Sequence, residues 1–470
     1  MYPFFPKHIA NTSIALYFIV LIMVSGLFIS HAMQLQWMLF GMVSVVFFFY
    51  YSRNLSRKWL YQSVKSFARK LFVTALLIRL VYVVFSYFYF MQANGHPFEF
   101  AAGDSMGYHG EGTWIVDLIR YGVFWEVYPV YIQEKGAVSD MGYPLFLVLQ
   151  YLVTDKSIII ARIIKALLSA YMCVLVYKMA VRNFGEAVGR MAGIFVLLMP
   201  NLIMYCGMHL KETEMIFVMM AYAERTDYLL RSRKITVGTI ALPLVLVGLL
   251  FLFRTVLGIA ALFALLTALL FSAQHVVKRG KRWIIAFWVG LTLAFFAGGT
   301  IAMEIETLWE EKDSNQQVRL EDRARKGNTF AKYAGASVFA PMIFTLPFPT
   351  MVETPNQETF RMLHGGVFVK NILSFFTIFA IFILIARKRW RENVFLLTFL
   401  LAYLAILTVS AFAHSERFHL PAVPLELIFA AFGVSQLSKK YRPWFSVWTV
   451  IIFVAIIGWS WFKLKGRGVF

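Results

Sequence analysis

Long apolar segments recur along the whole chain, and they constrain its fold more than any other feature. A backbone in contact with lipid must satisfy its hydrogen bonds internally, so a run of about 20 apolar residues is typical of a transmembrane helix. Thirteen segments have this character: residues 12–31, 34–52, 71–92, 157–177, 191–206, 213–230, 235–253, 255–274, 283–302, 366–386, 392–413, 420–437 and 444–462. With 60% hydrophobic residues, the sequence predicts an all-α polytopic membrane protein of about 13 transmembrane helices.

The basic residues are concentrated in short loops between these segments and account for a formal charge of +20. Short loops rich in Lys and Arg stay in the cytoplasm, so they define the inner side of the membrane. The remaining loops then lie outside: residues 93–156, 207–212, 303–365 and 414–419. Two of these extracytoplasmic loops are sizeable, 93–156 and 303–365. Since the basic residues flank the spans, we expect membrane lipids as neighbours and no nucleic acid as partner.

The stretch FEFAAGDSMGYHGEGTW, residues 98–114, combines acidic, small and aromatic residues in the first outer loop. Asp104 follows a predicted span by about a dozen residues and is a candidate catalytic carboxylate in a Gly-rich turn. Tyr108 and His109 can form hydrogen bonds with a substrate. Apolar residues at helical spacing over 115–123 predict a short helix along the membrane surface. The alternative reading of Asp104 is an ordinary turn or helix-cap residue.

A second polar site occurs in MPNLIMYCGMHLKETEMIF, residues 199–217, which lies between two apolar segments. Lys211 and Glu212 fall in its short outer turn, directly at the membrane face. The turn is either an ordinary polar helix boundary or a second part of an acidic site.

Cationic residues also occur at the predicted outer ends of helices, away from the cytoplasmic loops: Arg162, Lys165, Arg254, Arg361, His364, Lys370 and Arg417. Each alone is compatible with a side chain that extends to the lipid headgroups. Their shared depth next to two acidic loops favours a site that holds a lipid phosphate while a carboxylate acts nearby. His414 lies in the same outer turn as Arg417, and no zinc-ligand spacing is present there.

Three stretches, taken in order, resemble the GT-C superfamily of integral-membrane glycosyltransferases, in particular the branch with protein O-mannosyltransferases and lipid A aminoarabinose transferases. GDSMGYH (103–109) resembles the first outer loop of that family. MGYPLFLVLQYL (141–152) and the segment 161–213 resemble its Tyr-Pro, small-residue helix, Phe-Gly turn, proline and Lys-Glu pair. ERFHLPAVPLELIFAAFG (416–433) is similar to its Arg-Tyr/Phe-x-x-Pro-x-x-Pro helix.

The resemblance implies a polyprenyl-phosphate-linked sugar donor and a glycan, lipid or protein acceptor, with the active site on the periplasmic side of a bacterial inner membrane. It implies Asp104 as the catalytic carboxylate, Glu212 as the acidic residue of the second loop and Arg417 as a donor-phosphate contact. From their positions, Arg254 and the pair Arg162 and Lys165 are further candidates for the phosphate. Lys211, Tyr108, His109 and His414 are candidate substrate contacts. A divalent metal, Mg or Mn, between Asp104 and Glu212 is conceivable because hard cations favour carboxylate oxygens.

Four parts of the chain follow from this interpretation. Residues 1–70 form two extra N-terminal helices and a basic loop, 71–302 the GT-C-like core with its outer loop 93–156, 303–365 the second outer loop, and 366–470 the C-terminal helices. The apolar piece SVFAPMIFTLPFPT within 303–365 is too short and Pro-rich to span, so we expect it in an interfacial or re-entrant position.

Other function classes remain open at this point. A transporter or flippase needs charged groups near the bilayer midplane, for which Arg79 and Glu426 are the candidates. A polysaccharide polymerase or ligase could use a similar donor, and a non-catalytic assembly subunit is a further alternative. The sequence contains no Walker loop, GxGxxG or GxSxG motif, so nucleotide-driven chemistry is disfavoured.

Overall fold

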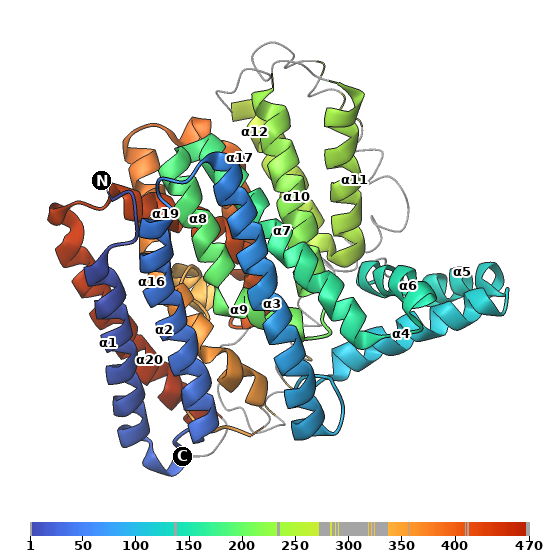
Figure 1. Cartoon of the computed structure of the whole chain (residues 1–470), viewed down its shortest axis with the longest axis horizontal. Helices are drawn as coiled ribbons and strands as arrows, with labels where there is room; N and C mark the ends of the chain where they lie inside the picture. Colours follow the sequence, from blue (N-terminus) through green and yellow to red (C-terminus); the bar gives the residue numbers. More distant parts are fainter. Residues whose placement is uncertain are drawn as a thin grey trace.

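The computed structural model describes residues 2–135, 139–232, 236–271, 337–355, 357–408, 410 and 413–466, with isolated positions 283, 287, 290, 318, 321 and 324. Every regular element in these ranges is helical (Figure 1). The α-helices are α1 (Lys7–Leu27), α2 (Leu35–Lys58), α3 (Val64–Asn94), α4 (Gly103–Arg120), α5 (Phe124–Lys135), α6 (Gly142–Thr154), α7 (Ile158–Phe184), α8 (Glu186–Leu198), α9 (Pro200–Met204), α10 (Glu212–Arg231), α11 (Val237–Phe253), α12 (Thr255–Phe271), α16 (Glu358–Ala386), α17 (Val394–Thr408), α18 (Glu416–His419), α19 (Val423–Gln436) and α20 (Arg442–Lys465). The 3-10 helices are η1 (Ile29–His31), η2 (Tyr205–Gly207), η4 (Ser337–Met342), η5 (Trp390–Glu392), η6 (Leu420–Ala422) and η7 (Lys439–Tyr441).

Seven helical segments among the described residues are long and apolar enough to cross a membrane. They are α1, α2, α3, α7, α16, the run from α18 to α19, and the run from η7 to α20. The bent pair α8 and α9 adds an eighth if it counts as one span. The prediction of an all-α integral membrane protein is therefore confirmed.

The predicted number of 13 spans is not confirmed. The segments at 235–253, 255–274 and 392–413 form α11, α12 and α17, which have 17, 17 and 15 residues in the described part of the chain, at or below the lower end of the usual spanning length. The segment at 213–230 forms α10, whose second half carries Glu224, Arg225 and Asp227. Most of the segment at 283–302 and about half of the loop 303–365 lie outside the described residues. The sequence pattern therefore predicted the positions of the helices more accurately than their lengths.

Helices α8, α16 and α19 form the interior of the bundle, where glycines allow close approach. A Cβ atom at Gly433 of α19 would lie 2.1 Å from the Phe376 carbonyl oxygen of α16. At Gly366 of α16 it would lie 1.9 Å from Oδ1 of Asn201 in α9. Close packing through small residues is the usual way in which helices associate inside a membrane. It also fixes α9, which carries a side chain of the site described below.

The break between α8 and α9 accounts for the deeply placed Arg79. The two helices meet at an angle of 53°, and Pro200 has no N–H to donate to the carbonyl of Val196 four residues earlier. Arg79 donates instead, through Nη2 to Val196 and through Nη1 to Leu197, both at 3.2 Å. Its Nε donates to Ser169 Oγ at 2.7 Å. Arg79 thus satisfies carbonyl groups that the helix break leaves open.

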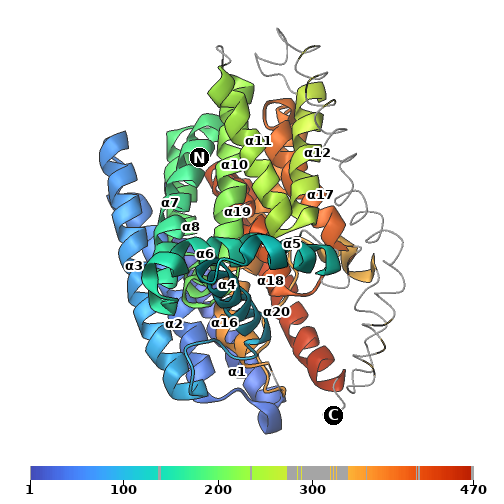
Figure 2. The ribbon, with the colours of Figure 1, turned by 90° about the vertical axis from the view of Figure 1, so that its right-hand side faces the viewer.

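Helices α4, α5 and α6 cross the direction of the long helices, next to the end of α11 (Figures 1 and 2). The helix predicted over 115–123 is present up to Arg120 as part of α4, and its position along the membrane surface stays a prediction. However, α4 begins at Gly103, so Asp104 occupies the first turn of an 18-residue helix and not a flexible turn. A carboxylate in a first helical turn is stabilised by the helix dipole. This correction gives Asp104 a fixed position.

The apolar segment at 343–352 is buried within the protein. Asn371 of α16 donates to the carbonyls of Thr345 and Pro347, and Lys370 donates to the carbonyl of Leu346. Leu346 and Val352 are completely buried. The segment predicted as interfacial or re-entrant, 337–350, is thus largely buried from Ile343 onward, where polar side chains of a long helix satisfy its backbone, whereas Pro341 and Met342 are exposed.

Candidate active site

Arg417 of α18 links two carboxylates that are far apart in the sequence. Its Nη1 donates to Oδ2 of Asp104 and its Nε donates to Oε1 of Glu212. The Glu212 side chain is completely buried, whereas that of Asp104 is 61% exposed and that of Arg417 is 22% exposed. The structure thus brings together three predicted residues, with a guanidinium between a buried acid and an exposed one.

A second guanidinium lies on the buried side of the same site. Arg254 occupies the turn between α11 and α12, with its Nη2 3.6 Å from Oε1 of Glu212. Its guanidinium carbon lies 4.4 Å from the centre of the Phe418 ring, a cation–π arrangement. Its Nη1 donates to the hydroxyl of Tyr403 at 3.5 Å. We call Asp104, Glu212, Arg254 and Arg417 the acid–arginine cluster.

Residues that the sequence analysis missed hold α18 in place. Asn201 of α9 and Tyr205 of η2 donate to the two carboxylate oxygens of Glu416, both at 2.7 Å. The Tyr403 hydroxyl donates to the carbonyl of Phe418 at 2.8 Å. These bonds fix the backbone on both sides of Arg417. The available signal was an acidic residue directly before Arg417 in an apolar context, where a charge needs a partner.

Two of the predicted substrate contacts lie beside the cluster. Tyr108 of α4 packs edge-on against Tyr143, with ring centres 5.3 Å apart. Burial raises the pKa of Tyr108 to about 12, while the nearby Arg417 opposes this rise. Lys211 directly precedes Glu212, forms an ion pair with Asp140 and donates to the Phe253 carbonyl at 2.8 Å. Burial and, to a smaller extent, the Arg254 guanidinium lower the pKa of Lys211 to about 6.

His109 belongs to a separate network. Its Nδ1 and the Tyr151 hydroxyl are 2.8 Å apart, and the same hydroxyl lies 3.0 Å from Nε2 of His209. The backbone N–H of His209 donates to Glu99 at 3.2 Å, and Ser105 also donates to Glu99. Burial lowers the pKa of His109 and of His209, so both rings are held in the neutral form at pH 7. This network ties the start of α4 to the turn before Glu212.

Arg162 and Lys165 donate to backbone carbonyls outside the acid–arginine cluster, and His414 lies in a neighbouring cavity. Lys165 donates to the carbonyls of Met208 and Leu210 and lies 3.5 Å from Glu214. Arg162 donates to the Pro97 carbonyl at 2.6 Å. His414 lines a small cavity with Glu416, Trp459 and Lys463. We therefore assign Arg162 and Lys165 to the positioning of neighbouring backbone.

The predicted metal pair, Asp104 and Glu212, holds a guanidinium in this arrangement. The two carboxylates accept from different nitrogens of Arg417, so a divalent ion that bridged them would have to displace the guanidinium, and a metal at this pair stays a prediction. Among the described residues, no group of three or more His, Cys, Asp or Glu side chains is placed to hold a metal. No step below is assigned to a metal.

Comparisons with family models, curated proteins and solved structures find no match for this chain. The GT-C resemblance therefore rests on the three sequence stretches alone. The geometry independently offers an exposed carboxylate that can accept a proton and two guanidiniums that can bind an anion.

Proposed function

We propose that the protein is a membrane glycosyltransferase that moves a sugar from a polyprenyl-phosphate-linked donor to an acceptor on the extracytoplasmic side. The observation that carries the proposal is the position of Arg417 between the exposed Asp104 and the buried Glu212. An arginine bound to an exposed carboxylate can exchange that partner for a phosphate, whereas its bond to a buried carboxylate persists.

The proposed reaction uses this exchange. The donor phosphate binds Arg417 in place of Asp104, with Arg254 as a second cation, and Glu212 keeps both guanidiniums oriented. The released Asp104 accepts the proton of an acceptor hydroxyl. The acceptor oxygen then bonds to the anomeric carbon while the bond from that carbon to the phosphate oxygen breaks. Negative charge develops on the leaving polyprenyl phosphate, where the two guanidiniums stabilise it.

The transport alternative loses its best supporting residues. Arg79 donates to backbone carbonyls and Ser169, and Glu426 faces Lys370 at 3.9 Å within the bundle. Both charges are thus occupied in the fold. A polymerase or ligase would use the same donor chemistry with a different acceptor, so the acceptor distinguishes it from the proposed enzyme.

Mass spectrometry of the envelope tests the proposal and identifies the substrates. The glycans, lipids and glycoproteins of the envelope would be compared among three strains of a bacterial host. One strain carries the parent protein, one carries Asp104→Asn, and one lacks the protein. We expect one sugar modification to disappear in both altered strains. Identical profiles in parent and Asp104→Asn strains, at equal protein abundance, would contradict the proposal.

A further inference from the structure

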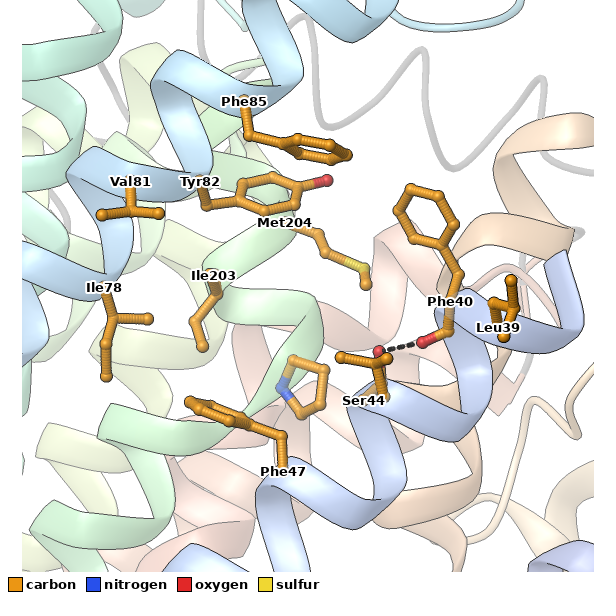
Figure 3. A pocket seen from close by; sticks show the side chains of 12 residues that line it. Leu39, Phe40, Ser44, Phe47, Ile78, Val81, Tyr82, Phe85, Ile203 and Met204 are labelled. Atoms are coloured by element: carbon orange, nitrogen blue, oxygen red, sulfur yellow. Dashed lines mark hydrogen bonds between the residues drawn. The ribbon is translucent and has the colours of Figure 1, made fainter. Parts of the chain in front are cut away.

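Two cavities follow one another between helices α2 and α3. The first is an apolar groove of about 490 Å³ over α9, lined by Leu39, Phe40, Val43, Ser44, Phe47, Ile78, Val81, Tyr82, Phe85, Pro200, Ile203 and Met204. Figure 3 shows the side chains of α2 and α3 on its two sides, with Ile203 and Met204 between them. The single polar contact drawn there is the bond from Ser44 Oγ to the Phe40 carbonyl, so the groove offers almost no free polar group.

The second cavity, of about 460 Å³, is polar and continues from the first. Its lining is Gln34, Gln36, Trp37, Tyr89, Gln92, Ala93, Phe100, Glu353, Glu358 and Arg361. On α2 its residues directly precede those of the groove, and on α3 they directly follow them. The Phe40 ring of the groove also contacts the Tyr89 ring of the polar cavity, with centres 5.6 Å apart. The two cavities are thus neighbours along α2 and α3, one apolar and one polar, and we treat them as two parts of one candidate site.

The charges of the polar part select the type of headgroup. Arg361 is already paired with Glu353 at 3.0 Å and Glu358 at 3.1 Å, so the two acids exceed the one base. A phosphate would meet two carboxylates there, which disfavours it. Three glutamine amides, each a donor and an acceptor, match hydroxyl groups. The Nε of Arg361 and the Oε2 of Glu353 also have no hydrogen-bond partner among the described residues.

We infer that this site binds a single-chain amphiphile with an uncharged, hydroxyl-rich headgroup, such as a glycolipid. The chain lies in the apolar groove and the headgroup lies in the polar cavity. Phe100, which lines the polar cavity, precedes Asp104 by four residues, so the headgroup is placed close to the start of α4. The site is distinct from the acid–arginine cluster, which has two guanidiniums for two carboxylates, one of them the exposed and displaceable Asp104.

Photolabelling in lipid nanodiscs tests the inference without any sugar transfer, so its result is independent of the proposed activity. One probe is dodecyl glucoside with a diazirine in its chain, and the other is dodecyl phosphate with the same chain. We expect the glucoside to label 39–47 and 78–85 about tenfold more than the phosphate, which corresponds to about 1.4 kcal/mol. Equal labelling by both probes would show ordinary surrounding lipid and overturn the inference.

Two valines of α3 supply a matched pair of variants. Val81 lines the groove and Val84 does not, and both side chains face outward, with 70% and 48% exposed. Val81→Trp should fill the groove and abolish the labelling, whereas Val84→Trp should leave it unchanged. The same labelling in both variants would remove the groove as the chain site. Gln92→Lys should move the preference toward the phosphate probe, and an unchanged ratio would refute the assignment of the headgroup.

Discussion

The two ends of α10 carry similar clusters that differ in one respect. Near its C-terminal end, Arg182 of α7 binds Glu224 at 2.7 Å and Asp227 at 2.9 Å. At its N-terminal end, Arg417 binds Glu212 and Asp104. Each arginine is about one quarter exposed and lies between two acids. The acids next to Arg182 are 5% and 4% exposed, whereas Asp104 is 61% exposed.

Because of this difference, we interpret the Arg182 cluster as structural. In the Arg417 cluster, we expect that a ligand can replace the exposed Asp104. Glu224 and Asp227 belong to one helix, and Asp227 also accepts from Asn183 and Arg231, so the Arg182 cluster ties α7 to α10. Asp104 and Glu212 come from different helices, and only Glu212 is shielded from solvent. Breaking a buried pair costs stability, whereas an exposed pair contributes little. The two clusters therefore predict opposite effects of the same substitution.

The largest expected effect is that of Asp104→Asn. Loss of a general base typically lowers a rate by about 100-fold to 10,000-fold, while an exposed carboxylate adds little to stability. Asp227→Asn should do the reverse, with a loss of roughly 3–5 kcal/mol in stability and normal transfer per folded molecule. Thermal unfolding and sugar transfer would be measured on both variants. Near-normal turnover of Asp104→Asn would remove Asp104 from the mechanism.

A smaller effect is expected for Arg417. Arg417→Ala removes a charge-assisted contact to the donor phosphate. This loss should cost roughly 1.5–3 kcal/mol of binding free energy, or about one to two decades in donor affinity. Arg417→Lys keeps the charge but not the two-pronged geometry, so it should retain part of the activity. Titration with a non-hydrolysable polyprenyl-phosphate analogue measures this directly, with Arg182→Lys as a control that binds normally. If Arg417→Ala binds the analogue like the parent, Arg417 is a headgroup anchor.

Arg254→Gln should have a weaker effect still. Arg254 lies 3.6 Å from Glu212, and we expect it to act on the phosphate at longer range than Arg417. A loss of about 1 kcal/mol corresponds to about fivefold in donor affinity. The same titration at low and high salt checks this, because a longer-range charge effect is screened. A loss as large as that of Arg417→Ala would mean that Arg254 is the main phosphate ligand.

The smallest effect is expected for Tyr108→Phe. Burial raises the pKa of Tyr108 to about 12, so its hydroxyl remains protonated up to about pH 10 and does not serve as the base. The pH profile of transfer should therefore keep the same shape in Tyr108→Phe, with a modest change in rate. A pH profile of the transfer rate that differs in shape between Tyr108→Phe and the parent would show that Tyr108 takes part in proton transfer.

The sequence predicted which residues meet at this site better than it predicted the hydrogen bonds that hold them there. Because successive loops were assigned to opposite sides of the membrane, Asp104, Glu212, Arg254 and Arg417 were predicted on one face. Ion pairs link these four residues in the structure. The supporting Glu416 and Glu99 were missed because each is a single acid with a partner, Asn201 or His209, that is more than 100 residues away. Arg162 and Lys165 show the same limit, since the structure pairs both with backbone carbonyls. A cation at the right depth can bind either a phosphate or a nearby backbone carbonyl, and only the tertiary structure distinguishes the two.

The most direct test of the central claim is a transfer reaction with purified protein in detergent. Polyprenyl-phosphate-linked sugars would be offered with hydroxyl-bearing acceptors from the envelope, and released polyprenyl phosphate and glycosylated acceptor would be quantified together. We predict equal amounts of both products from the parent protein, Asp227→Asn activity in proportion to its folded fraction, and a rate about 100-fold to 10,000-fold lower from Asp104→Asn. Product formation by Asp104→Asn at the parent rate, or binding of the donors by the folded parent without any transfer, would contradict the account.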